Sequence, residues 1–206
     1  MDISSDPLRL LLSYDGATDP PNDVPIEVTE VAPEIVMMPF WTSAMCEAVI
    51  AAAEATGRFD PDPDDPVPGH EVSLATISPV LFDALQNDIG RRVWPVLRRQ
   101  WPLIDYHGLR DAFVIRYRSG EQESLRLHQD IAQVSMTVRL CDGYEGAHLS
   151  FPRQRWDNRD QPVGTLVAWP SLVTHPHEAT TLESGVKYGL TIWCDLPSDV
   201  NATLYV

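Results

Sequence analysis

The sequence lacks the features of a membrane, secreted or nucleic-acid-binding protein. Only one of its 15 basic residues is a lysine, Lys187, and 30 acidic residues bring the net charge to −15. Nucleic acids and anionic membrane surfaces both attract clustered basic side chains, so we expect neither as a partner. No apolar run approaches the ~18 residues of a membrane helix, and the first residues lack the basic start and apolar stretch of a signal peptide.

Cysteine is also scarce. Cys46, Cys141 and Cys194 are widely separated and odd in number, which is typical of reduced thiols rather than of a disulfide framework. We therefore expect a cytoplasmic protein. Nothing in the composition indicates its oligomeric state.

The segment after residue 40 predicts a first helix. Thr42 or Ser43 can cap a helix that runs through an alanine-rich stretch to about Thr56, where Gly57 would end it. The segment 58–69, "RFDPDPDDPVPG", carries four prolines and four aspartates. Such a segment is a surface loop, because proline fits neither a helix interior nor a central strand.

A second helix and then several short strands are predicted further along. Ser78 and Pro79 form a favourable cap and first-turn pair, and Pro95 should kink or restart this helix near Trp94. Segments rich in β-branched and aromatic residues follow, separated by turn clusters. They are 112–118, 126–140, 147–152, 165–170 and 187–196.

This order of elements predicts an α+β fold. We expect residues 1–25, which are acidic and rich in proline, to form a loosely held arm. Residues 26–206 would form a single domain, with a helical lead-in at 37–105 packed outside a jelly-roll of strands at 111–206.

The stretch "SLRLHQDIAQ" contains a candidate metal-binding pair. In a strand, His128 and Asp130 would point to the same face, because side chains two residues apart do so. About one such pair is expected by chance among six histidines and 30 acidic residues. The pair therefore needs a partner before it indicates a metal site.

A third ligand is available downstream at His148, His175 or His177. Two histidines and one carboxylate with three open positions form the facial triad of non-haem Fe(II) oxygenases. If the turn near Gly185 made a hairpin, Lys187 would lie roughly 13 Å along the partner strand from His177. A metal-chelated five-carbon dicarboxylate together with a lysine side chain spans a gap of that order.

Three ordered blocks of the sequence resemble the Fe(II)/2-oxoglutarate dioxygenases, most closely the catalytic domain of the procollagen lysyl hydroxylases and the related prolyl 4-hydroxylases. The blocks are "FVIRYRSGEQESLRLHQD" (113–130), "YEGAHLSF" (144–151) and "THPHEATTLESGVKY" (174–188). With a weaker match in the helical lead-in, the resemblance covers most of residues 37–196. It implies a double-stranded β-helix, which is a jelly-roll, with N-terminal helices packed outside.

The resemblance also implies roles for individual residues. His128, Asp130 and His177 would bind iron, and Lys187 would pair with the C5 carboxylate of 2-oxoglutarate. Lysyl hydroxylases usually have arginine at that last position, and prolyl 4-hydroxylases have lysine. Tyr117 matches a pocket tyrosine whose hydroxyl would bond the same carboxylate.

Other positions are less constrained by the sequence. Thr137, where the family tends to have asparagine, is a candidate cosubstrate contact. Arg139 could bind a substrate carboxylate if the polar face of its strand lines the pocket, and His175 would be a pocket residue near the metal. Gln129 replaces a family histidine and is expected to alternate away from the metal, whereas Trp169 and Trp193 are expected in the core.

The sequence thus predicts a hydroxylase that uses Fe(II), 2-oxoglutarate and O₂ on an amino-acid side chain. A compact single domain favours a lysine-like or cyclic amino acid that is free or carrier-bound, and a peptidyl lysine or proline is the alternative. Two other readings stay open: a non-catalytic metal-binding jelly-roll module, and a zinc hydrolase, because zinc accepts the same ligands. Loss of a ligand or of the carboxylate-binding cation would favour the non-catalytic module, and neither loss is seen.

Overall fold

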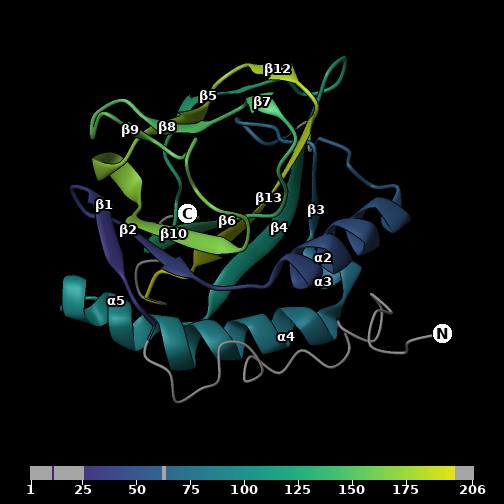
Figure 1. Ribbon diagram of the computed structural model, residues 1–206. Coiled ribbons are helices and arrows are strands. Elements are labelled where there is room, and N and C mark those ends of the chain that lie inside the picture. Colours follow the sequence, from purple (N-terminus) through teal and green to yellow (C-terminus); the bar gives the residue numbers. More distant parts are fainter. Residues whose placement is uncertain (1–10, 12–25, 62–63, 198–206) are drawn as a thin grey trace.

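A computed structural model of the protein describes residue 11, residues 26–61 and residues 64–197 (Figure 1). The predicted acidic arm, residues 1–25, lies outside these ranges except for Leu11, which is buried in the main core. No helix within the described ranges has the length and apolar character needed to cross a membrane.

The helices and strands follow one another in this order: β1 (Thr29–Ala32), β2 (Ile35–Pro39), α2 (Ser43–Thr56), β3 (Glu71–Ser73), α3 (Leu74–Ile77), α4 (Pro79–Asp88), the π-helical turn η2 (Ile89–Val93), α5 (Trp94–Gln100), β4 (Leu109–Arg118), β5 (Leu125–His128), β6 (Val134–Arg139), β7 (Glu145–Gly146), β8 (Leu149–Phe151), β9 (Trp156–Asp157), β10 (Thr165–Pro170), the 3₁₀ turn η3 (Leu172–Thr174), β11 (His177–Ala179), β12 (Leu182–Ser184) and β13 (Val186–Cys194).

The strands form one large and two small antiparallel sheets. The large sheet has seven strands in the order β1-β2-β10-β6-β13-β4-β3. A four-stranded sheet, β5-β11-β8-β9, and the pair β12-β7 lie over one face of it, and the helices cover the other face (Figure 1). Three strands of the large sheet, β1, β2 and β3, come from the chain before residue 111.

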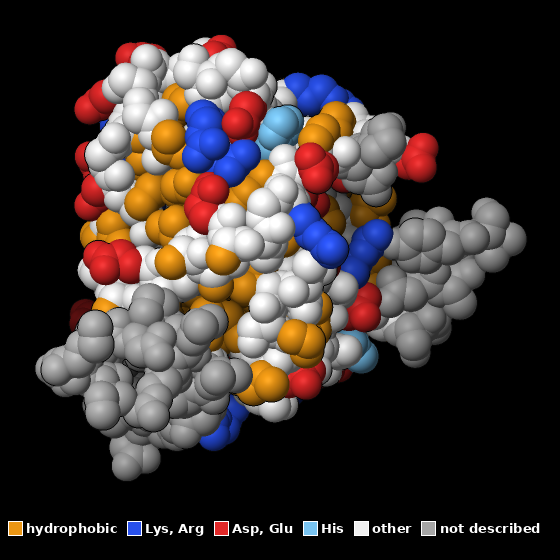
Figure 2. Space-filling model, turned by 90° about the vertical axis from the view of Figure 1, so that its right-hand side faces the viewer, with side chains coloured by type: hydrophobic (Ala, Val, Ile, Leu, Met, Phe, Trp, Pro, Cys, Tyr) orange, Lys and Arg blue, Asp and Glu red, His pale blue; other side chains and the backbone are white. Residues whose placement is uncertain are grey.

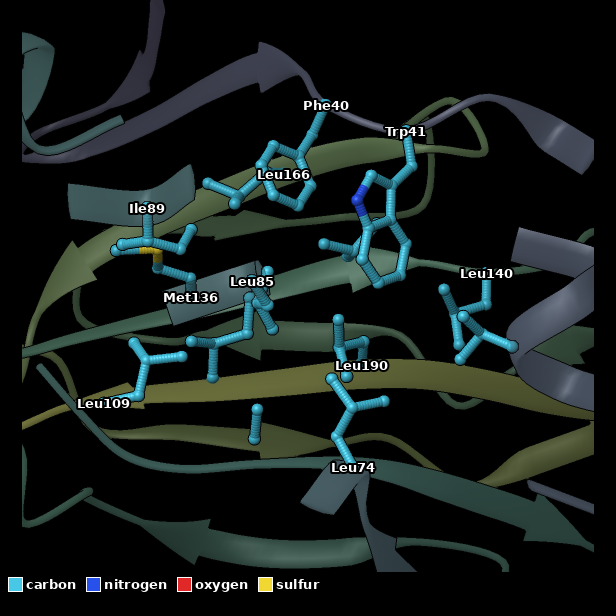
Figure 3. Packing of buried hydrophobic residues seen from close by; sticks show 14 of the residues in the cluster. Phe40, Trp41, Leu74, Leu85, Ile89, Leu109, Met136, Leu140, Leu166 and Leu190 are labelled. Carbon is cyan, nitrogen blue, oxygen red and sulfur yellow. The ribbon is translucent and has the colours of Figure 1, made fainter. Parts of the chain in front are cut away.

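The main core lies between the large sheet and the helices. Leu74 of α3 and Leu85 of α4 face Met136 of β6, Leu166 of β10 and Leu190 of β13 (Figure 3). All five side chains are fully buried. This apolar packing fixes the position of the strands whose opposite faces point toward the smaller sheets.

The predicted helix boundaries are confirmed. Thr42 caps α2 by accepting a hydrogen bond from the N–H of Met45, and Gly57 ends it in the left-handed conformation with φ of 62°. Ser78 caps α4 in the same way as Thr42. The helix restarts at Trp94 after the π-helical turn, which accommodates the missing N–H of Pro95.

The predicted strand 126–140 is in fact two strands. β5 belongs to the four-stranded sheet and β6 to the large sheet, and residues 131–133 form a bend between them. Gln133 holds this crossing, because its N–H donates to the carbonyl of Cys194 and its side-chain amide donates to the carbonyls of Asp105 and Asp195. The chain therefore passes from one sheet to the other directly after Asp130.

The predicted hairpin around Gly185 is wrong. β12 pairs with β7, and β13 pairs with β4 and β6, so Lys187 faces Tyr117 rather than Thr181. Gly185 has φ of 80°, and a side chain there would collide with the backbone of Gly143. The glycine therefore directs the chain from the small pair of strands into the large sheet.

An ion-pair cluster fixes the edge of the large sheet near the loop that leads to β5. Arg116 of β4 donates to Glu54 of α2 at 2.9 Å and to Glu121 of the loop at 2.7 Å. The arginine also stacks on Phe59, with its Cζ 4.2 Å from the ring centroid. Figure 2 shows the side of the molecule that includes this edge, where acidic and basic side chains lie close together.

Candidate metal centre and cavity

Three side chains with metal-binding atoms meet where β5 and β11 pair. His128 ends β5, and it lies opposite His177, which begins β11. His128 Nε2 lies 3.6 Å from Asp130 Oδ1, and His177 Nε2 lies 3.6 Å from Asp130 Oδ2. One candidate ligand atom from each residue lies within 4.8 Å of the other two. The structure thus brings together the three residues to which the resemblance pointed.

Backbone carbonyls orient both imidazole rings. His128 Nδ1–H donates to the carbonyl of Arg126 at 2.8 Å, and His177 Nδ1–H donates to the carbonyl of His175 at 3.0 Å. Because a carbonyl only accepts, each neutral ring carries its proton on Nδ1 and presents an unprotonated Nε2 to the cluster. Metal-binding histidines commonly have such a partner on the other nitrogen.

The protonation states of His177 and Asp130 favour binding of a cation. Burial lowers the pKa of His177, which keeps this imidazole neutral. Burial raises the pKa of Asp130, but the imidazoles of His128 and His177, each 3.6 Å away, outweigh it, so the carboxyl pKa lies below its usual value. Burial also lowers the pKa of His128, and Asp130 more than offsets this. A buried carboxylate between two imidazoles is an oxygen and nitrogen donor set that a divalent transition metal fits.

Aromatic rings enclose His177. The ring centroids of Trp169 and Phe151 lie 5.1 Å and 5.3 Å from that of His177. Both aromatic side chains are almost completely buried. They limit the rotation of the imidazole and exclude water from one side of the cluster.

The three side chains line a cavity of about 390 Å³ between the large and the four-stranded sheets. Buried residues such as Tyr117 and Lys187 form one part of its wall, and exposed residues such as Asp64 and Arg110 form another. The cavity therefore has a closed end among buried side chains and an end that is open to solvent.

Lys187 lies at the closed end. Its Nζ donates to the carbonyl of Ala147 at 2.5 Å and lies 4.9 Å from the ring centroid of Tyr117, its partner across β13 and β4. Burial lowers the pKa of Lys187 to about 8. Among the residues that the structure describes, no carboxylate lies within ion-pairing distance of this ammonium group.

Of the polar residues on β6, Thr137 reaches the cavity and Arg139 does not. Thr137 lines the cavity, opposite Thr191 of β13, which also lines it. Arg139 does not, contrary to the expectation that it could bind a substrate carboxylate. Its guanidinium donates to the carbonyls of Cys141, Arg159 and Gln161 and pairs with Asp142, because it lies at the end of β6 beside the 157–164 loop.

His175 does not reach the cavity either, although the sequence suggested a pocket role. Its Nδ1 lies 2.9 Å from the hydroxyl of Thr174 and its Nε2 lies 3.3 Å from the carbonyl of Pro33. The backbone carbonyl of His175 connects it to the cluster, because this carbonyl accepts the hydrogen bond from His177 Nδ1. The third candidate, His148, lies outside the cluster and the cavity wall.

Some cavity residues were assigned elsewhere or missed. Trp169 and Trp193 were expected in the core. Trp169 is buried in a hydrophobic cluster and also lines the cavity, and the half-buried Trp193 packs against a second cluster and lines the cavity too. Among the described residues, neither buried indole N–H has a hydrogen-bond partner. Gln129 also lines it, although it was expected to point away. Strand alternation from Lys187 would have placed Trp193 on the cavity face, whereas Arg110 gave no signal of this kind.

The fold resembles that of solved 2-oxoglutarate-Fe(II) oxygenases and prolyl hydroxylases. A viral collagen prolyl hydroxylase from Paramecium bursaria Chlorella virus-1, in its 2-oxoglutarate complex, superposes with a TM-score of 0.61 at 18% identity, over 82% of this chain and 100% of the other. A Pseudomonas putida prolyl-4-hydroxylase gives a TM-score of 0.57 at 16% identity, over 80% of this chain and 94% of the other.

Sequence relatives are procollagen lysine hydroxylases. Procollagen-lysine,2-oxoglutarate 5-dioxygenase 1 of Mus musculus is 26% identical over 172 residues, which are 76% of this chain and 23% of the mouse protein. A multifunctional procollagen lysine hydroxylase and glycosyltransferase of Caenorhabditis elegans is 26% identical over 179 residues. The chain spans about a quarter of the length of these relatives, and no family model matches it. The resemblance to the Fe(II)/2-oxoglutarate dioxygenase superfamily is confirmed.

Proposed function

We propose that this chain is an Fe(II)- and 2-oxoglutarate-dependent hydroxylase that acts on an amino-acid side chain. The observation that carries the proposal is the joint placement of two features on one cavity wall. One is the cluster of His128, Asp130 and His177, and the other is the buried cation of Lys187, for which the described residues offer no carboxylate partner. The names of the relatives and structural neighbours support the same reaction class.

The cluster would hold iron through His128 Nε2, His177 Nε2 and one oxygen of Asp130. Two imidazoles and one carboxylate would hold the ion and leave positions open for exchangeable ligands. When bound, ferrous iron with 2-oxoglutarate and O₂ supplies the oxidising power to hydroxylate an unactivated C–H bond, with release of succinate and CO₂. The protein supplies position, charge and exclusion of water.

Lys187 would bind the C5 carboxylate of 2-oxoglutarate at the closed end of the cavity. A buried ammonium without a carboxylate partner is costly, and an incoming carboxylate removes that cost. Tyr117 and Thr137 lie on the same wall and would donate hydroxyl hydrogen bonds to the cosubstrate. Burial raises the pKa of Tyr117, so its hydroxyl stays protonated and can donate at physiological pH.

The arrangement of the sheets supports a double-stranded β-helix. The large sheet and the smaller sheets face each other with the cavity between them, and the strands of each are antiparallel. His177 belongs to the four-stranded sheet and Lys187 to the large sheet, so the proposed metal ligand and the proposed cosubstrate cation reach the cavity from opposite sheets.

Anaerobic absorption spectroscopy tests the proposal. Adding Fe(II) and 2-oxoglutarate together should give a weak visible band, because the cosubstrate chelates ferrous iron through its keto oxygen and C1 carboxylate. Zn(II) with 2-oxoglutarate gives no such band and serves as the control. A wild-type protein that binds Zn(II) but shows no band with Fe(II) and 2-oxoglutarate would contradict the proposal and favour a zinc site.

A further inference from the structure

Ser135 is a polar residue that lies on the cavity face of β6 without reaching the cavity. Its neighbour Met136 belongs to the main core, so Ser135 points to the opposite face together with Thr137, which lines the cavity. Ser135 itself is fully buried and is not part of the cavity wall. Its partners on the two adjacent strands are Trp169 and Trp193, which both line the cavity. A hydroxyl group therefore lies beneath the wall, flanked by two of the tryptophans that form it.

The hydroxyl of Ser135 has a buried partner. Its Oγ lies 2.7 Å from the Oγ of Ser171, the residue that directly follows β10. Both serines are almost completely buried. A buried hydroxyl is costly unless it is hydrogen-bonded, and alanine would fill nearly the same space without that cost. We therefore expect the pair to contribute something besides packing.

The carboxylate of Asp130 is the acceptor that this pair can serve. Burial raises the pKa of Asp130, but polar groups outweigh it, and the hydroxyl of Ser135 is one of them beside the two imidazoles of the cluster. An ionised carboxylate only accepts hydrogen bonds. Ser135 can therefore direct its O–H to Asp130 while it accepts the O–H of Ser171, which gives a chain of two hydrogen bonds.

The segment that begins at Ser171 also contacts the backbone of the metal-binding residues. The N–H of Leu172 donates to the carbonyl of Asp130 at 3.0 Å. Near the other end of the segment, the carbonyl of His175 accepts the hydrogen bond from His177 Nδ1 at 3.0 Å. One short segment thus connects two of the three candidate ligands.

The same segment has a strained backbone that outside contacts hold in place. Leu172 has φ of 62°, a left-handed conformation that residues other than glycine rarely adopt. Arg153 Nη1 donates to the carbonyl of Val173 at 3.2 Å, and Gln154 Nε2 donates to that of Thr174 at 3.1 Å. Such strain persists only where surrounding contacts fix the backbone, and it is common at functional sites. These contacts therefore keep the segment in place beside the cluster.

We propose that Ser135 and Ser171 are positioning residues for the carboxylate of Asp130. Ser171 donates to Ser135, and Ser135 donates to one carboxylate oxygen, so the other oxygen keeps its orientation toward the metal ion. The inference rests on the proposed function, because it requires the cluster of His128, Asp130 and His177 to bind a metal. It implies an order of dependence, in which Ser171 acts on the carboxylate only through Ser135.

A double-mutant cycle measured on metal affinity tests this inference. Mn(II) without 2-oxoglutarate would be titrated into the wild type, Ser135→Ala, Ser171→Ala and the double variant, and the EPR signal of the free ion would give the unbound concentration. Ser171→Thr retains a hydroxyl at the second position. The matched control is Ser73→Ala, because the hydroxyl of Ser73 on β3 donates to the carboxylate of Asp111 at 3.1 Å, outside the cavity wall. Circular dichroism would verify that each variant folds.

Ser135→Ala should weaken Mn(II) binding roughly 10- to 100-fold, the usual effect of removing a group that orients a metal ligand. Ser171→Ala should weaken it less, because the hydroxyl of Ser135 remains but loses the partner that orients it. The double variant should bind Mn(II) as Ser135→Ala does, since the second serine acts through the first. Ser171→Thr and Ser73→Ala should bind Mn(II) as the wild type does.

Three results overturn the inference. A folded Ser135→Ala binds Mn(II) as tightly as the wild type, or the fold-changes of the two single variants multiply in the double variant, or Ser73→Ala weakens Mn(II) binding as much as Ser135→Ala does. If Ser135→Ala does not fold, the comparison at Ser171 decides, and equal Mn(II) affinities of Ser171→Ala and Ser171→Thr overturn the inference.

The proposed function is tested separately by the ferrous 2-oxoglutarate band of the wild type. If the band is present, the proposed function stands whatever the serine variants show. If the wild type binds Mn(II) but gives no ferrous band, the proposed function fails and the Mn(II) affinities alone decide the role of the serines. A wild type that binds no Mn(II) would remove both.

Discussion

The two faces of the large sheet differ sharply in composition, although the same strands form both. On β13, Leu190, Ile192 and Cys194 point to the helices and are almost completely buried in apolar surroundings. The residues between them, Thr191 and Trp193, line the cavity. One strand therefore contributes alternate residues to the core and to the candidate site.

The difference shows where the protein places unfavourable interactions. The core face contains closely packed aliphatic side chains that favour folding. The cavity face contains a buried ammonium at Lys187 and a buried carboxylate at Asp130. It also contains the indole N–H groups of Trp169 and Trp193, which have no hydrogen-bond partner in the described part of the chain. Such groups oppose folding unless a ligand satisfies them. The favourable free energy of packing on the core face thus offsets the cost of burying polar groups on the cavity face.

The largest effect is expected from removal of a proposed metal ligand on the cavity side. His177→Ala should eliminate the ferrous 2-oxoglutarate band and reduce succinate formation to background, because it removes one of three donors. His175→Ala is the matched control, since that side chain bonds Pro33 and Thr174 outside the cavity, and this variant should retain iron. Retention of the band in His177→Ala with its loss in His175→Ala would reverse the ligand assignment.

On the core face, Leu190→Ala should lower the free energy of unfolding by about 2–5 kcal/mol, because it leaves a cavity among fully buried neighbours. Thr191→Val, one residue away on the cavity face, replaces a hydroxyl by a methyl group and should change it by at most about 1.5 kcal/mol. Urea denaturation measures both. An equal decrease in the free energy of unfolding of both variants would show that the two faces contribute equally to stability.

At the closed end of the cavity, Lys187→Met should stabilise the ligand-free protein while it weakens 2-oxoglutarate binding. Burial lowers the pKa of Lys187 from 10.5 to about 8. The unfolded chain therefore binds this proton more tightly, and the Lys187 contribution to stability improves as the pH rises from about 8 to about 10.5. At pH 7 we expect a gain of about 1–3 kcal/mol in the free energy of unfolding. A destabilised variant with unchanged 2-oxoglutarate affinity would contradict this account.

The smallest effect is a pH dependence of cosubstrate binding. Lys187 must be protonated to pair with a carboxylate, so the wild-type affinity for 2-oxoglutarate should fall above about pH 8, by at most tenfold per pH unit. Cys141 and Arg139 also act on this pKa, and Cys141 raises it whereas Arg139 lowers it. Lys187→Arg stays charged and should show a flat profile in calorimetric titrations. A parallel decline in both proteins would place the titration elsewhere.

Local rules predicted much of the fold. Capping at Thr42 and Ser78 and the stop at Gly57 depend on neighbouring residues alone, and they were found from the sequence. The division of 126–140 into β5 and β6 and the path of the chain after Gly185 depend on pairing with distant strands. Those features could not be found, because hydrophobic alternation does not reveal which sheet a strand joins.

The candidate site was predictable where family motifs and alternation agreed. His128, Asp130 and Lys187 lie on the cavity wall as the sequence suggested. Arg139 lies outside the cavity wall, because alternation shows which face a residue occupies but not how far along the strand the cavity extends. Arg110 was missed because a register shift at Asp111, invisible in the sequence, brings it to the cavity.

The most direct test of the central claim is a crystal structure with 2-oxoglutarate and Mn(II), a redox-silent substitute for ferrous iron. We expect one metal ion bound by His128, Asp130 and His177, with the distal carboxylate of 2-oxoglutarate within hydrogen-bonding distance of Lys187 Nζ. A metal bound elsewhere, or a distal carboxylate directed to Arg110 and away from Lys187, would contradict that claim.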